Sequence, residues 1–147
     1  MSWRQDLDAF FRQRELRQQR EQESINKWQR VADEFLDSVA MPALEELKPE
    51  LEKHGRKVEV ARAYQRAVMT VEYQNEEELA YMVRVRVTAH GARAYPEMRL
   101  RIWTGDRQYT AQGSFRSGAQ DYGAADITKD EVINYFVAQY TGHFREL

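Results

Sequence analysis

The chain has 147 residues, of which 42% are hydrophobic and 31% charged, a length and composition that predict a single soluble globular domain spanning residues 1–147. A formal net charge of −2 excludes a strong overall attraction to nucleic acid or to an anionic membrane. Because cysteine is absent, disulfides, thiolate nucleophiles and cysteine-based zinc sites are excluded, and a reducing compartment is favoured. With neither a secretory signal nor an apolar run long enough to span a bilayer, we expect a cytoplasmic protein without membrane contact.

Residues 1–22 predict a short amphipathic helix, because their apolar side chains recur at a near-helical spacing. The wholly polar stretch 17–24 follows this apolar stripe and needs no packing partner. The large apolar residues of the segment are Trp3, Leu7, Phe10, Phe11 and Leu16.

Residues 25–54 predict a longer helix, with an apolar stripe centred on Trp28, Phe35 and Val39. Proline removes one backbone donor and crowds the preceding turn, so Pro42 and Pro49 predict either a bend near residues 41–42 or two consecutive helices. The apolar stripe continues through both prolines, which favours a kinked helix over a loop. The helix should end at Gly55, since glycine readily takes the left-handed conformation that closes a helix.

Residues 57–116 alternate between apolar and polar side chains, which predicts a four- to five-stranded antiparallel meander. We expect a loop over residues 91–95, with a strand beginning at Pro96, and a hairpin turn around Gly105 before a strand over residues 108–115. The face that should pack against the long helix carries Val83, Val85, Leu100 and Ile102.

The last predicted element is a helix over residues 128–141, ended by Gly142. Thr128 and Glu131 have the spacing of a capping box, and Ile127 and Val132 that of a hydrophobic staple. The sequence therefore predicts an α+β fold: a long, kinked N-terminal helical region packed on the meander, completed by a C-terminal helix.

Four arginines share the sheet face opposite the predicted core. Strand alternation places them together with an aromatic side chain, an arrangement that can bind nucleic acid or another polyanion. The favoured interpretation is a solvent-exposed face whose arginines pair across strands with Glu72 and Glu97. The residues of this alternative nucleic-acid site are Arg84, Arg86, Arg99, Arg101 and Trp103.

The apolar side chains of residues 1–22 require a contact, because leaving them in water is costly. They either dock on the chain's own sheet or long helix, or they bind a partner protein or a second copy through Trp3, Leu7, Phe10 and Phe11. The leading hypothesis is a non-enzymatic interaction or assembly module of this kind.

A third hypothesis places a small ligand at the 116–126 loop. No nucleophile arrangement or phosphate loop supports it, and no two histidines stand at the i, i+4 spacing of a helical metal motif. We therefore expect no enzymatic activity, no cofactor and no metal.

Overall fold

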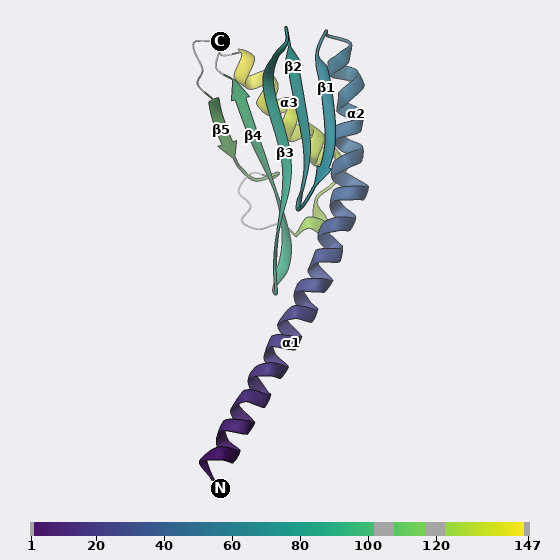
Figure 1. The fold of residues 1–147 in the computed structure, drawn as a ribbon. Helices are drawn as coiled ribbons and strands as arrows, with labels where there is room; N and C mark the ends of the chain where they lie inside the picture. The colour runs from purple at the N-terminus through teal and green to yellow at the C-terminus, as the bar shows by residue number, and fades with distance from the viewer. Residues whose placement is uncertain (1, 102–107, 117–122, 146–147) are drawn as a thin grey trace.

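The computed structural model describes residues 2–101, 108–116 and 123–145. Its fold is α+β: a five-stranded antiparallel sheet carries helices on one face, and a long helix extends far beyond the sheet at its N-terminal end (Figure 1). The predicted fold class is confirmed. The predicted turn around Gly105 and the side chains of Ile102 and Trp103 lie outside the described residues.

The N-terminal helical region is continuous from residue 3 to residue 52. It consists of α1 (Trp3–Phe35), a π-helical turn (Leu36–Ala40) and α2 (Met41–Glu52). The predicted division between residues 22 and 25 is absent, because the Arg, Gln and Glu residues of this stretch favour helix and none of them breaks it. Ser2 and Gln5 form a capping box at the start of α1.

The irregularity predicted near residues 41–42 takes the form of the π turn directly before Pro42. A π turn widens the hydrogen-bonding pattern by one residue, which lets the helix continue past a proline that cannot donate. At the other end of α2, Gly55 has a φ of 78° and the amide of Arg56 donates to the carbonyl of Leu51, so the predicted glycine cap is confirmed.

The five strands follow one another in the sheet in chain order, as a meander requires. They are β1 (Lys57–Ala63), β2 (Arg66–Tyr73), β3 (Glu76–Thr88), β4 (Gly91–Arg101) and β5 (Gln108–Gln112). Two-residue turns join β2 to β3 and β3 to β4. In the first of them Gln74 and Asn75 both have positive φ, which suits the twist of a tight hairpin.

The loop predicted over residues 91–95 is wrong, since these residues form the first half of β4. Ala92 and Ala94 pair with Val87 and Val85 and are buried, so this half of the strand contributes to the core. Pro96 therefore lies inside a strand. It is tolerated there because, among the described residues, the pairing with β5 ends at Glu97, and the next bridge on that edge of β4 is the isolated one from Arg93 to Gly123.

The core lies between the sheet and the helices. The expected apolar face is confirmed for its described members, since Val83, Val85 and Leu100 are buried, and Phe35 of α1 is buried against them. The C-terminal helix α3 (Lys129–Arg145) completes this layer through Val132 and Phe136.

The start of α3 is as predicted, whereas its end is not. The amide of Glu131 donates to the Thr128 hydroxyl and the amide of Thr128 donates back to the Glu131 carboxylate, which is the reciprocal pattern of a capping box. Gly142 does not end the helix, which continues to Arg145. Glycine weakens a helix interior by only about 1 kcal/mol, so the helix can run through it.

Candidate functional site

The N-terminal part of α1 projects from the domain as a free helix (Figure 1). Residues 2–23 are all exposed, and partial burial begins at Ser24. At 1.5 Å per residue the projecting part is about 30 Å long. Helical propensity and the N-terminal capping box account for its helical conformation, and contact with the body of the protein does not.

The projecting helix exposes an unusual amount of apolar surface. The exposed fractions are 65% for Trp3, 47% for Leu7, 56% for Phe10 and 51% for Phe11. At 100° per residue these four side chains fall within one stripe on the helix surface, which we call the N-terminal apolar stripe. Leu16 is 48% exposed and lies on the opposite side of the helix.

The structure overturns the hypothesis that these side chains dock on the chain's own sheet or long helix. The helix is directed away from the sheet, and the ring contacts of Phe10 and Phe11 are with each other, at 5.4 Å between centroids. Burying one such side chain is worth about 1.5–3 kcal/mol. A partner that covers the N-terminal apolar stripe would gain this energy several times over.

The arginine residues of the alternative site lie on the open face of the sheet, where most of them are paired. Arg84 forms an ion pair with Glu97 at 2.7 Å, Arg99 with Glu77 at 2.8 Å, and Arg101 with Glu76 at 3.1 Å. The expected partner Glu97 is therefore confirmed, while Glu76 and Glu77 take the place of Glu72.

Arg86 lies over the ring of Tyr95, with 5.9 Å between its guanidinium carbon and the ring centroid. A polyanion on this face would have to compete with three carboxylates for the guanidinium groups that they already hold. The arrangement is typical of a sheet face stabilised by cross-strand charge pairs.

The sequence analysis missed a polar cluster around Glu78. This carboxylate is 4% exposed; one oxygen accepts a hydrogen bond from the Tyr140 hydroxyl, and the other lies 3.4 Å from the Arg56 guanidinium. Arg56 also stacks on Tyr73, at 3.9 Å from the ring centroid. A signal in the sequence could have revealed it: three consecutive glutamates at the start of a strand indicate an irregular strand pairing. The structure has a bulge there, which leaves Glu78 without a paired residue in β2.

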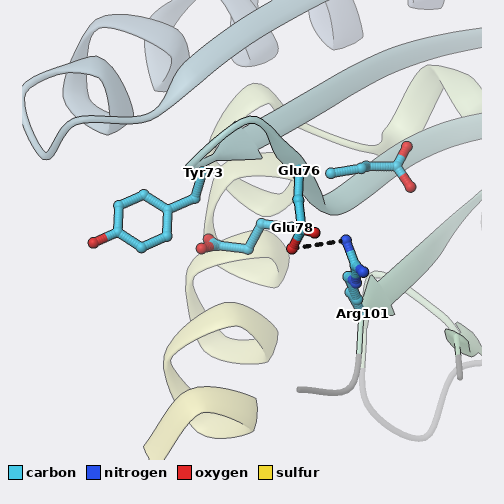
Figure 2. A pocket seen from close by; sticks show the side chains of 5 residues that line it. Tyr73, Glu76, Glu78 and Arg101 are labelled. Carbon is cyan, nitrogen blue, oxygen red and sulfur yellow. Dashed lines mark ion pairs between the residues drawn. The ribbon is translucent and has the colours of Figure 1, made fainter. Parts of the chain in front are cut away.

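This cluster has no room for a ligand. Figure 2 shows Glu78 directed toward Tyr73, and Glu76 toward Arg101. The cavity that these residues line has a volume of about 10 Å³, no more than one water molecule requires. Burial and the hydrogen bond to Glu78 raise the pKa of Tyr140 to about 12, so at neutral pH the tyrosine is a fixed donor to the carboxylate. The cluster is a structural network.

The third predicted site, the 116–126 loop, is described only at its two ends. Arg116 forms an ion pair with Glu131 and donates to the carbonyl of Asp126, which ties the beginning of the loop to its end and to α3. The hydrogen bond from Arg116 is the main reason that the pKa of Glu131 falls to about 2. This arrangement fixes the start of α3.

The described residues contain no group of three or more His, Asp or Glu side chains able to hold a metal ion. Within the same residues, no helix is long and apolar enough to cross a membrane. Comparison of this chain with protein-family models, with curated proteins and with solved structures finds no match.

Proposed function

We propose that this protein is an assembly module that binds another protein chain through the projecting part of α1. The sheet and the helices packed on it form the scaffold, and the N-terminal apolar stripe is the contact surface. The proposal places the protein in the cytoplasm, in keeping with a chain that contains no cysteine. It includes no catalytic step and no cofactor.

One observation carries the proposal: four large apolar side chains, each about half exposed or more, occupy one side of a helix that the rest of the domain leaves uncovered. Aromatic residues at this density are typical of the centre of a protein interface, where they contribute most of the binding energy. The open sheet face with Arg84, Arg99 and Arg101 has weaker support as a binding surface, because carboxylates already pair with these arginines and neutralise their charge.

The test compares two substitutions on the same exposed helix. Phe10→Glu places a charge in the N-terminal apolar stripe, and Leu16→Glu places the same charge on the opposite side at a similar exposure, 48% against 56%. Light scattering measures the mass of each full-length protein in solution. Crosslinking in the cells that produce the protein identifies the chains bound to each variant.

Phe10→Glu should remove an association that Leu16→Glu retains, while both proteins keep the circular-dichroism spectrum of the folded parent protein. If the mass and the captured chains are the same for the parent and for Phe10→Glu, the N-terminal apolar stripe is not a binding surface and the proposal is wrong.

A further inference from the structure

The N-terminal apolar stripe is one end of a longer pattern on α1. From Trp3 to Phe35 a single line of residues advances by alternating steps of four and three, which is the 3.5-residue repeat of a coiled coil. We call this line the α1 seam. Its residues are Trp3, Leu7, Phe10, Arg14, Arg17, Glu21, Ser24, Trp28, Val31 and Phe35.

The α1 seam is apolar at both ends and polar in the middle. Its first three residues belong to the projecting tip, and its last three lie where α1 reaches the domain: Trp28 and Val31 are partly buried against the core, and Phe35 is buried in it. Between them stand Arg14, Arg17, Glu21 and Ser24, all exposed except Ser24, which is half-buried.

This order discriminates between two ways of pairing identical helices. A parallel pair would set Arg14, Arg17 and Glu21 each against its own copy, so that every polar layer except Ser24 would hold like charges. An antiparallel pair centred on Gln19 sets Arg17 against Glu21 of the second copy, and Arg14 against Ser24. In the part of the chain that the structure describes, neither Arg17 nor Glu21 has an ion-pair partner of its own.

The same antiparallel register matches the apolar ends. Phe10 meets Trp28 of the second copy, Leu7 meets Val31, and Trp3 arrives beside Phe35. At this point the domain offers a groove of about 220 Å³ between α1 and the short 3-10 helix Ala124–Asp126. The groove is lined by Val31, Glu34, Phe35, Ser38, Val39, Ala124 and Ala125.

We propose that α1 pairs with α1 of a second copy of this chain in antiparallel orientation, about a two-fold axis at Gln19, with each Trp3 seated in the other copy's groove beside Phe35. The inference rests on the proposed function and adds to it the identity and the geometry of the partner. Such a contact is isologous, so it closes as a dimer and leaves neither tip exposed.

The first measurement is mass in solution by light scattering over a concentration series. The full-length protein should be a dimer, and Phe10→Glu should weaken it at least about 100-fold, because each dimer contains the change twice. Leu16→Glu lies outside the α1 seam and should leave the dimer intact. A protein that is monomeric at every concentration overturns the pairing, whereas Phe10-dependent capture of another chain would still support the proposed function.

The second measurement determines orientation. The chain has no cysteine, so Asp8→Cys and Gln19→Cys each give one spin label per chain, and both positions lie outside the α1 seam. In the antiparallel pair the two labels should be nearly level at Gln19 and about 33 Å apart along the helix axis at Asp8. Equal separations at the two positions would show a parallel pair, and a shorter separation at Asp8 than at Gln19 would show another register; either result overturns the inference.

Discussion

Replacing Tyr140 with phenylalanine would leave the buried carboxylate of Glu78 without its hydroxyl donor. Arg56, at 3.4 Å and with a side chain that is 22% exposed, would be the remaining partner in the cluster around Glu78. A buried charged acceptor that loses one hydrogen bond costs about 1–3 kcal/mol. For a domain of this size, a loss of ~2 kcal/mol lowers the unfolding temperature by roughly 4–8 °C.

The assay is urea unfolding at neutral pH, read by circular dichroism, for Tyr140→Phe, Glu78→Gln and the double variant. The two changes act on one hydrogen bond, so the double variant should lose about 1 kcal/mol less than the sum of the single losses. Tyr64→Phe is the matched control, because Tyr64 is 82% exposed.

The protonation state gives an independent check. Because the pKa of Tyr140 is raised from 10.0 to about 12, its contribution to the free energy of unfolding is complete below about pH 10 and is lost as the pH rises toward 12. Tyr140→Phe should lack this loss. The reasoning would be refuted by a Tyr140→Phe protein within about 0.5 kcal/mol of the parent, or by additive losses in the double variant.

Two further predictions concern the start of α3 and the glycines Gly55 and Gly142. The pKa of Glu131 is lowered from 4.5 to about 2, so its stabilising effect is present above about pH 4.5 and is lost as the pH falls toward 2. Glu131→Gln should lower the free energy of unfolding by roughly 0.5–1 kcal/mol at pH 7, since the ion pair is partly solvated. If this difference in stability between the variant and the parent protein persists in acid, the prediction is wrong. Gly55→Ala should destabilise the protein by about 1–2 kcal/mol, because Gly55 has a φ of 78°. Gly142→Ala, in the interior of α3 with open space around it, should stabilise the protein by about 0.5–1 kcal/mol. Thermal unfolding of both variants measures the two changes, and changes of the same sign would contradict the backbone argument.

Local patterns in the sequence predict much of this fold because their causes are local. The capping box at Thr128 and Glu131 needs only two side chains three residues apart, and the glycine cap at Gly55 needs only one backbone conformation. Strand alternation likewise predicts which of Val83, Arg84 and Val85 face the core, because the period of two follows from the pleat itself.

The errors arise where the surroundings outweigh the local signal. Gly91 and Pro96 indicate a loop to a reader of the sequence, yet the residues between them pair with the end of β3 and bury two alanines. In the sequence, Glu78 has the pattern of a turn residue. In the structure it is in the interior, because of the bulge and because Tyr140, 62 positions further along the chain, donates a hydrogen bond to it.

For the candidate interaction surface, the sequence by itself determined that Trp3, Leu7, Phe10 and Phe11 share one side of a helix and cannot remain in water without cost. Only the tertiary structure decided between docking and projection. The polar stretch after them is helical and unbroken, so it carries the N-terminal apolar stripe away from the sheet and leaves it exposed. The physical reason is that helical periodicity is a property of neighbouring residues, whereas the side chains that cover a helix come from wherever the rest of the chain folds.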